Sequence, residues 1–311
     1  MAEIELWQAV REQLAAGRRC VLLAVADSHG SSPGKTGALM VMSAAGPLAG
    51  TIGGGRIESA LMKEVMADLQ AERFTPSWLT RRHRPEAEDS SGMICGGEQT
   101  VVTALLRPEH LADIRTLITA LTAGRRCGWR MSTLGWALDG GVTESGWVAD
   151  TDWCYRHLSG PRVTVYLVGG GHVSLALSAL LRGLDFRVVV LEERAEVSSF
   201  LQNVQAHQKR VCGYEEVGAE IPEGDAVFAA IMTHSHERDR VALRALAGKR
   251  LGYLGVLGSR SKVRQLLENC PAPPFLHAPM GVPICSHSPE EIAVSVAAEM
   301  VGVRNARIPT P

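Results

Sequence analysis

Three short segments of the sequence combine residue types that can bind or transform a ligand. One glycine-rich loop occupies residues 50–58 (GTIGGGRIE), another occupies residues 169–174 (GGGHVS), and residues 95–98 read CGGE. Glycine allows a backbone to approach a ligand closely and to adopt positive φ. Each loop opens a helical pattern, so main-chain N–H groups at two places are suited to hold phosphate. The cysteine suggests sulfur or metal chemistry nearby.

The second loop has the context of a dinucleotide-binding fingerprint, because it follows an apolar strand pattern and opens a helix. Gly169 makes the tight turn, Gly171 lets the backbone meet a pyrophosphate, and Ser174 takes the small third position. Glu192 directly follows the next predicted strand, which ends at Leu191, and an acid there can bind a ribose 2′-OH, while Arg194 leaves a 2′-phosphate open. The alternative is a Rossmann scaffold that binds no nucleotide.

Two further polar loops directly follow predicted strands in the same half of the chain. Residues 233–236 read THSH, and residues 258–262 read GSRSK. Ligands of open α/β sheets bind beyond the carboxyl ends of the strands, so we expect both loops at the same cleft edge. His234 and His236 suit a phosphate better than a metal, because they lack an acidic or cysteine partner. Arg260 either pairs with phosphate or begins a solvated helix.

The elements that position these loops form two patterns. The first pattern, up to residue 107, mixes helical stripes with strands and predicts an N-terminal α/β domain with a mixed sheet. Its predicted helices are 4–16 and 57–69, and its predicted strands are 21–25, 39–42, 48–52 and 100–106. We expect a connecting segment over residues 108–160, with a helix near 110–121. Its four tryptophans suggest packing between domains or subunits.

The second pattern begins after Ser159-Gly160-Pro161. Short buried strands alternate with helices, which predicts a doubly wound, Rossmann-like parallel sheet in a C-terminal domain, residues 161–311. The predicted strands are 163–168, 186–191, 226–232 and 253–257. A capping box with Ser288 as N-cap and Glu291 at the third helical position begins the last helix.

Composition disfavours several classes of protein. The 311 residues include 32 Lys plus Arg and 33 Asp plus Glu, a net charge of −1. The sequence therefore lacks the excess of basic residues that is typical of nucleic-acid-binding domains. No apolar run approaches the ~18 residues of a membrane helix, and the acidic residues 1–5 do not resemble a secretory signal. We therefore expect a cytoplasmic protein with no nucleic-acid or membrane partner.

The seven cysteines are scattered and never paired as C-x-x-C. This argues against a disulfide framework or a structural zinc site, and most of them are expected to be small buried residues. Cys95 is the exception, because its neighbours Gly96 and Gly97 are not packing residues. Its alternative interpretation is a turn residue buried against the 39–52 hairpin.

Several long motifs, in the same order along the chain, resemble the xanthine dehydrogenase accessory (XdhC/CoxI-type) family. The resemblance covers about residues 15–105 and 162–302, and it leaves 107–160 unmatched. Ser174 departs from the glycine usual in the family, and Glu192-Glu193 departs from its Asp-type acids. The matching motifs are residues 30–40 (GSSPGKTGALM), 50–58, 93–97 (MICGG), 169–173, 232–236, 258–260, 277–281 (HAPMG) and 288–295 (SPEEIAVS).

The resemblance implies a maturation factor for molybdenum hydroxylases of the xanthine dehydrogenase and aldehyde oxidase type. Such factors bind the molybdenum cofactor, a pterin that sometimes carries a cytosine dinucleotide. They hold it while a cysteine desulfurase supplies a terminal sulfido ligand, and they then pass it to the apo-enzyme. The family also implies a homodimer, and we expect no turnover chemistry of its own.

On this interpretation Cys95 contacts molybdenum or carries sulfur, and backbone N–H groups of Gly53–Gly55 hold the cofactor's phosphate. Glu58 binds the pterin's amino groups or is a solvated helix acid, and Ser31 and Ser32 donate to phosphate or cap their loop. The full set of candidate cofactor-binding residues is Ser31, Ser32, Gly53, Gly54, Gly55, Glu58, Gly96, Gly97, Gly169, Gly171, His172, Glu192, His234 and Arg260.

Two other functions compete with this one. The first is an NAD(P)-dependent oxidoreductase, for which His234 or His236 would donate the proton, although no substrate-pocket motif supports it. The second is a sensor whose Rossmann-like domain reads a nucleotide and regulates docking to a partner. Neither excludes the carrier role, because the C-terminal domain could bind the cofactor's nucleotide part.

Overall fold

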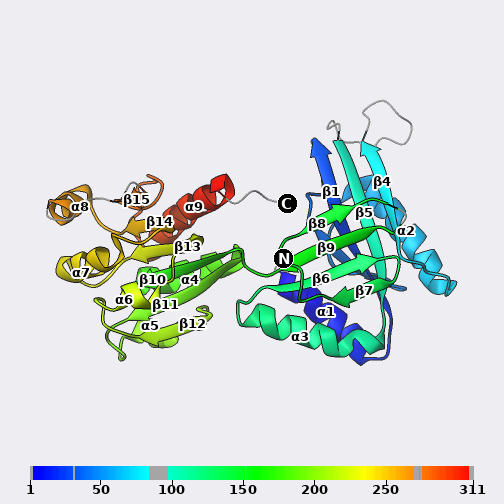
Figure 1. Cartoon of the computed structure of the whole chain (residues 1–311), viewed down its shortest axis with the longest axis horizontal. Helices are drawn as coiled ribbons and strands as arrows, with labels where there is room; N and C mark the ends of the chain where they lie inside the picture. Colours follow the sequence, from blue (N-terminus) through cyan, green and yellow to red (C-terminus); the bar gives the residue numbers. More distant parts are fainter. Residues whose placement is uncertain are drawn as a thin grey trace. The chain divides into compact units, whose positions relative to one another are not determined.

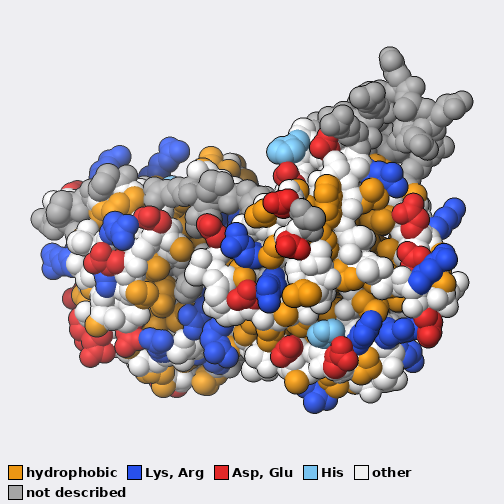
Figure 2. Space-filling view, turned by 45° about the vertical axis from the view of Figure 1, so that its right-hand side comes forward, with side chains coloured by type: hydrophobic (Ala, Val, Ile, Leu, Met, Phe, Trp, Pro, Cys, Tyr) orange, Lys and Arg blue, Asp and Glu red, His pale blue; other side chains and the backbone are white. Residues whose placement is uncertain are grey.

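The computed structural model describes residues 3–30, 32–83, 97–150, 152–268, 273 and 275–307. The chain folds as two compact units that meet in sequence between Gly160 and Pro161 (Figure 1). Among the described residues, no helix has the length and apolar character needed to span a bilayer. Figure 2 shows acidic, basic and hydrophobic side chains interspersed on the face in view.

The first unit contains two antiparallel sheets and three α-helices among its described residues. The larger sheet has the strand order β3-β2-β1-β5-β4, and the smaller one has the order β7-β6-β9-β8. The elements are α1 (Glu3–Ala15), β1 (Cys20–Gly30), β2 (Leu39–Ser43), β3 (Gly46–Gly50), α2 (Gly55–Gln70), β4 (Ser77–His83), β5 (Gly97–Leu106), the 3₁₀ turn η1 (Pro108–His110), α3 (Leu111–Thr122), β6 (Cys127–Ser132), β7 (Gly135–Leu138), β8 (Gly146–Val148) and β9 (Cys154–Ser159).

Both faces of the larger sheet are covered, which explains the continuous apolar run of β1. Alternate residues of a strand point to opposite faces. Leu22 and Ala24 pack in a cluster with α1, α3 and the smaller sheet, whereas Val21, Leu23 and Val25 pack against α2. Figure 1 shows α1 and α3 lying side by side. The larger sheet therefore forms the middle layer of this unit.

Residues 108–160 belong to the body of the first unit. Trp129, Trp136 and Trp153 are at most 4% exposed, and they share one core cluster with Trp7 of α1. The Trp7 and Trp129 rings meet edge to face with centroids 5.6 Å apart. These tryptophans are thus core residues and not the packing surface between domains or subunits that their clustering suggested, because a buried indole contributes most by filling the interior.

The second unit is built on a six-stranded parallel sheet in the order β12-β11-β10-β13-β14-β15. One face packs against α4 and α9, and the other packs against α6, α7 and α8. Its elements are β10 (Val163–Val168), α4 (His172–Gly183), β11 (Phe186–Glu192), α5 (Ser198–Gln202), β12 (Gln208–Val211), α6 (Val217–Glu220), β13 (Gly224–Ile231), α7 (His236–Leu246), β14 (Leu251–Val256), α8 (Arg260–Leu267), β15 (Leu276–His277) and α9 (Pro289–Arg307).

The predicted fold class is confirmed, with a Rossmann-like parallel sheet following an N-terminal α/β unit. One detail differs, because every described pairing in the first sheet is antiparallel and not mixed. The capping box of α9 forms as expected: Ser288 Oγ accepts from Glu291 N, and the Glu291 carboxylate accepts from Ser288 N. The strand predicted at 21–25 is longer in the structure, because β1 continues to Gly30.

Candidate functional site

Two glycine loops of the first unit touch through their backbones. A Cβ on Gly34 would overlap the carbonyl oxygen of Ile52 and lie 2.8 Å from Gln99 Nε2, and a Cβ on Gly53 would overlap Gly34 N. Side chains at either position would therefore force the loops apart. The segments 30–40 and 50–58 are thus brought into direct contact, although they are separate motifs in the sequence.

The three consecutive glycines 53–55 are required by their backbone conformation. Their φ angles are +122°, +72° and +74° for Gly53, Gly54 and Gly55. Other residue types rarely adopt positive φ, and a run of three is inaccessible to them in practice. The triple glycine turns the chain sharply from β3 into the start of α2.

Glu58 binds the donors of this loop. Its Oε2 accepts from Thr51 Oγ1 at 2.6 Å, Ile52 N at 2.9 Å and Gly54 N at 2.9 Å. Burial raises the pKa of the Glu58 carboxyl, but the hydrogen bonds from Thr51, Gly54 and Ile52 outweigh burial and lower that pKa below its ordinary value. The carboxylate of Glu58 therefore occupies a small cluster of donors, here called the Thr51–Gly54 nest.

Gln99 joins the nest to the neighbouring loop and is 2% exposed. Its Nε2 donates to Ile52 O at 2.7 Å, and its Oε1 accepts from Ser32 Oγ at 3.1 Å. Ser32 is itself buried and also lies within hydrogen-bond distance of Gly34 O. Ser32 thus acts inside the loop in this structure, which corresponds to the capping alternative.

The start of β5 lies beside the same loops. Gly97 pairs with Gly30 and Glu98 pairs with His29, at the end of β1. Cys95 and Gly96 directly precede Gly97 in the sequence, and Ser31 directly follows Gly30. The predictions for Cys95, Gly96 and Ser31 concern residues outside the described part of the chain.

The buried side chain of Glu192 is hydrogen-bonded to the second glycine-rich loop. This residue is fully buried at the carboxyl end of β11, and its Oε2 accepts from Gly170 N at 2.7 Å. Its Oε1 accepts from Tyr214 Oη at 3.0 Å and from Arg194 N and Nε, both at 3.1 Å. In this structure the Glu192 carboxylate therefore serves the loop, with both oxygens bonded inside the protein.

The backbone at Gly171 and His172, where α4 begins, is accessible from outside the protein. Nothing described lies within 4 Å of a Cβ built on Gly171, and His172 is exposed. The first N–H groups of an α-helix have no partner within the helix, so this end favours an anion. The geometry at Gly171 suits the close backbone approach expected from the fingerprint.

Glu193 reaches the residues that follow β13. Its Oε1 lies 3.2 Å from Arg238 Nε and 3.9 Å from His234 Nδ1. The His234 and Arg238 side chains are 37% and 43% exposed, so they bring this cluster to the surface of the carboxyl edge, while the Glu193 side chain is 14% exposed. His236 has a different partner, since its Nε2 lies 3.4 Å from Arg240 Nη2. No group of three metal-ligating side chains occurs among the described residues.

The side chain of Asp239 connects the two loops that follow β13 and β14 at the carboxyl edge of the parallel sheet. It is fully buried, and its Oδ1 accepts from Thr233 N at 2.9 Å and Thr233 Oγ1 at 2.7 Å. Its Oδ2 lies 2.5 Å from Lys262 Nζ, which also donates to Leu257 O. The loops after β13 and β14 are therefore held in one arrangement.

Glu299 anchors the segment after β15 to α9. Its Oε2 accepts from Tyr253 Oη at 2.6 Å and Gly281 N at 2.9 Å, and its Oε1 lies 3.2 Å from His277 Nδ1. Burial raises the pKa of Glu299, but the hydrogen bonds from His277, Tyr253 and Gly281 outweigh burial and lower it. Burial of Tyr253 and its proximity to Glu299 raise the pKa of the phenol well above its ordinary value.

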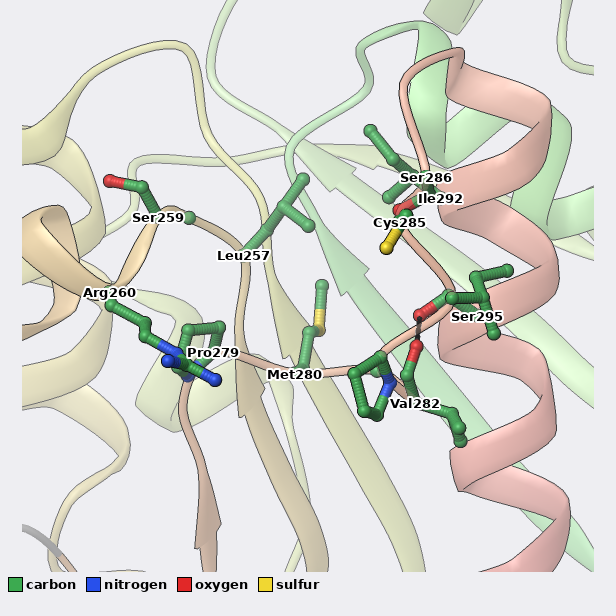
Figure 3. Close-up of a pocket in the computed structure, with 14 residues that line it drawn as sticks. Leu257, Ser259, Arg260, Pro279, Met280, Val282, Cys285, Ser286, Ile292 and Ser295 are labelled. Atoms are coloured by element: carbon green, nitrogen blue, oxygen red, sulfur yellow. Dashed lines mark hydrogen bonds between the residues drawn. The ribbon is translucent and has the colours of Figure 1, made fainter.

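A cavity of about 770 Å³ opens where β14 and β15 end. Figure 3 shows Arg260 on one side and Cys285 on the other, with the Cys285 sulfur pointing into the space beside α9. Cavities of this size accommodate small organic ligands. The Arg260 side chain thus lies at a pocket, which the sequence alone left undecided.

The comparisons with known proteins identify the family. The XdhC and CoxI family matches residues 13–81, and the XdhC Rossmann domain matches residues 165–300. Together these matches cover more than half of the chain. The chain belongs to the XdhC and CoxI family.

Two curated relatives and one solved structure are similar to this XdhC-family chain. An uncharacterized Escherichia coli protein, YqeB, is 28% identical over 90% of the chain, and a probable xanthine dehydrogenase subunit from Bacillus subtilis is 29% identical over 46%. The chain spans 43% and 44% of these relatives' lengths. A crystal structure of a xanthine dehydrogenase from Bacillus halodurans shares the fold, with 24% identity, a TM-score of 0.74 and coverage of 99% of this chain and 97% of that one.

Several residues that shape the XdhC-family site carry no sequence signal of their own. Gln99, Glu299 and Tyr214 lie outside the glycine motifs and act through partners distant in sequence. Asp239 also lies outside these motifs, and it binds Thr233 of the preceding loop and the more distant Lys262. Asp239 had one available clue, because it lies in the first turn of a helix directly after the THSH loop. A buried acid in that position commonly binds the N–H groups of its own loop.

The Glu192 carboxylate gives a pH-dependent prediction for the second unit. Burial raises its pKa, but the hydrogen bonds from Gly170, Arg194 and Tyr214 outweigh burial and lower that pKa below the ordinary value of 4.5. A lowered pKa stabilises the fold above the unfolded-state pKa, and this contribution disappears as pH falls through the folded-state pKa. Glu192→Gln should therefore cost about 2 kcal/mol at neutral pH.

The measurement is chemical unfolding of wild type and Glu192→Gln between pH 7 and pH 3. The difference in free energy of unfolding should stay constant above pH 4.5 and shrink below it. A difference that grew on acidification would contradict the assignment of a bonded, ionised Glu192.

Proposed function

We propose that this chain binds the molybdenum cofactor, holds it while a terminal sulfido ligand is installed, and transfers it to an apo molybdenum hydroxylase. Membership in the XdhC and CoxI family supports a role in xanthine dehydrogenase maturation. The Bacillus subtilis relative is named as a probable xanthine dehydrogenase subunit, which supports the same client class. Here the cofactor is cargo that the chain delivers.

The Thr51–Gly54 nest carries this proposal. Its two N–H groups and one hydroxyl already converge on one anionic oxygen of Glu58. Phosphate oxygens accept hydrogen bonds from backbone nests in the same way. The donor set therefore fits the phosphate of the pterin, with Glu58 as the internal anion that the phosphate replaces or joins.

Cys95 is proposed as the sulfur or molybdenum contact. It precedes Gly97 by two residues, and Gly97 pairs with Gly30 beside the Gly34 and Gly53 loops. A thiolate is the reactive form of cysteine and a soft ligand. The proposal thus places phosphate binding and sulfur chemistry at neighbouring points of one loop cluster.

The proposed partners follow from this sequence of events. A cysteine desulfurase supplies the sulfur, and the apo-hydroxylase receives the completed cofactor. We further propose that the chain acts as a homodimer.

The test is to purify wild type and Cys95→Ala from a host that makes the molybdenum cofactor, and to oxidise the bound material. We expect a fluorescent pterin, identified by mass, on wild type, and at least tenfold less on the variant, on the order of the loss of one charge-assisted contact. Cys154→Ala is the matched control, because Cys154 is a half-buried cysteine of the same unit. Absence of pterin from wild type would refute the carrier role.

A nucleotide-binding function of the second unit has its own support. Glu193, His234 and Arg238 meet at the carboxyl edge. Glu193 directly follows Glu192, which accepts from Gly170 of the glycine loop, and His234 belongs to the THSH segment. Acidic and basic groups together suit a ribose and its phosphate. Titration with NADH and NADPH separates the two alternatives: turnover supports an oxidoreductase, whereas binding that changes partner affinity without turnover supports a sensor.

A further inference from the structure

The pocket at the ends of β14 and β15 has a firmly anchored wall. Met280 N donates to Val256 O at 3.0 Å and Val282 N donates to Ser295 O at 3.2 Å. Ser295 Oγ donates back to Val282 O at 2.6 Å, the bond drawn in Figure 3. Together with the bond from Gly281 N to Glu299, these contacts fix the segment 280–282 against α9. The cavity is therefore formed before any ligand arrives.

The pocket carries one charged side chain. Of the residues that line it, Arg260 alone is charged, and it is exposed. Within the described part of the chain, the Arg260 guanidinium has no carboxylate partner. The neighbouring ammonium of Lys262 is engaged by Asp239 and Leu257 O. A cation without an acid nearby favours an anionic group, and the start of α8 adds to this preference.

The rest of the lining is mostly apolar. Val282 is 40% exposed and Ile284 is 47% exposed, and both lie on the pocket wall with Pro279 and Met280. A ligand that covers exposed aliphatic side chains removes apolar surface from water, which makes its binding more favourable. This surface suits a flat ring system, since the exposed side chains of Pro279, Val282 and Ile284 present apolar surface to it.

We propose that this pocket binds a phosphate-bearing planar heterocycle, with the phosphate at Arg260 and the ring against the Pro279–Ile284 wall. The inference deepens the proposed function, because both the pterin phosphate and the cytidine monophosphate part of the cofactor have this chemistry. A cytidine monophosphate part would occupy this pocket while the pterin phosphate stays in the Thr51–Gly54 nest, whereas the single phosphate of a bare pterin would occupy one of the two sites at a time.

Cys285 provides a local reporter for the test. It is an exposed free cysteine that lines the pocket, so a ligand should shield its thiol from alkylation. The full chain is treated with iodoacetamide, and the alkylated peptides are quantified by mass spectrometry. The probes are the oxidised phosphorylated pterin, its dephosphorylated form and cytidine monophosphate, and Cys154, a half-buried free cysteine of the first unit, is the internal control.

We expect the phosphorylated pterin or cytidine monophosphate to protect Cys285 and not Cys154, and the probe that protects identifies the source of the phosphate. Arg260→Ala should weaken protection about tenfold or more, and Arg260→Lys should retain part of it. Arg264→Ala is the matched control, an exposed arginine on the same helix that does not line the pocket.

Equal protection by the phosphorylated and dephosphorylated pterins, or no protection by any probe, would overturn the pocket assignment. Pterin retained by wild type from the host, together with an unprotected Cys285, would reject the pocket and leave the proposed function intact. Cys285 protected by cytidine monophosphate on a chain that retains no pterin would support the pocket and reject the carrier role.

Discussion

Gly34→Ala is expected to destabilise the first unit by about 3 kcal/mol or more, the upper range for overpacking, and to abolish pterin retention. The new Cβ would overlap the carbonyl oxygen of Ile52 and approach Gln99 Nε2 to 2.8 Å. Ile52 has little freedom to retreat, because its oxygen accepts from Gln99 and its N–H donates to Glu58. The variant therefore either separates the two loops or breaks the Gln99 and Glu58 bonds.

Denaturant unfolding followed by tryptophan fluorescence measures this effect in the right unit. All six tryptophans lie in the first unit: Trp7, Trp78, Trp129, Trp136, Trp147 and Trp153. Gly140→Ala is the matched control, because a Cβ at Gly140 has nothing described within 4 Å. We expect the control to stay within about 0.5 kcal/mol of wild type. Equal unfolding midpoints for the two variants would show that the loops are not in contact.

Asp239→Ala is expected to cost the second unit about 3 kcal/mol, the lower end of the loss for a broken buried ion pair, because Asp239 is fully buried while its partner Lys262 is 30% exposed. The substitution leaves Thr233 N without its acceptor and Lys262 without its carboxylate, whereas Thr233 Oγ1 can still donate to Ser235 O at 3.0 Å. Since Asp239 is fully buried, water does not easily replace it. The loops after β13 and β14 should loosen together.

Far-UV circular dichroism during denaturant unfolding gives the stability change, and hydrogen exchange in peptides covering 232–236 and 257–263 shows whether both loops loosen. Asp225→Ala is the control, because the Asp225–Arg250 pair of the same unit is 72% and 69% exposed. Its loss should stay below about 1 kcal/mol.

A double variant adds a sharper criterion to the Asp239 prediction. Asp239→Asn with Lys262→Met should be less destabilised than Lys262→Met alone, since it leaves no buried charge unpaired. The opposite order would mean that the stability of these loops does not come from the ion pair.

The local patterns of the sequence were sufficient for the architecture of the second unit. Strands buried on both faces of a parallel sheet are continuous apolar runs, and such runs were visible at 163–168, 186–191, 226–232 and 253–257. The turn from β10 into α4 could also be predicted, because Gly169 and Gly171 have the spacing of the dinucleotide-binding fingerprint and directly follow the strand pattern 163–168. The short edge strands β12 and β15 carried no comparable pattern, since four-residue and two-residue strands are below the length at which periodicity is informative.

The smaller sheet of the first unit shows where local pattern failed. Strands β6 to β9 have three to six residues each, and their tryptophans are typical both of interfaces and of interiors. Their place in the core depends on α1, which lies far earlier in the chain and supplies Trp7 to the same cluster.

The sequence by itself determined where the backbone turns sharply or lies close to a neighbouring segment, at the triple glycine and the fingerprint loop, because positive φ and close backbone approach restrict residue choice locally. The tertiary structure decided what the charged residues do. Glu192 turned inward because Gly170, Arg194 and Tyr214 surround it, whereas Arg260 stayed without a carboxylate partner, within the described residues, beside a pocket that also holds Cys285. A charge is satisfied by whatever partners the fold brings near it. Gly170 and Tyr214 each lie 22 residues from Glu192 along the chain, beyond the reach of any local pattern.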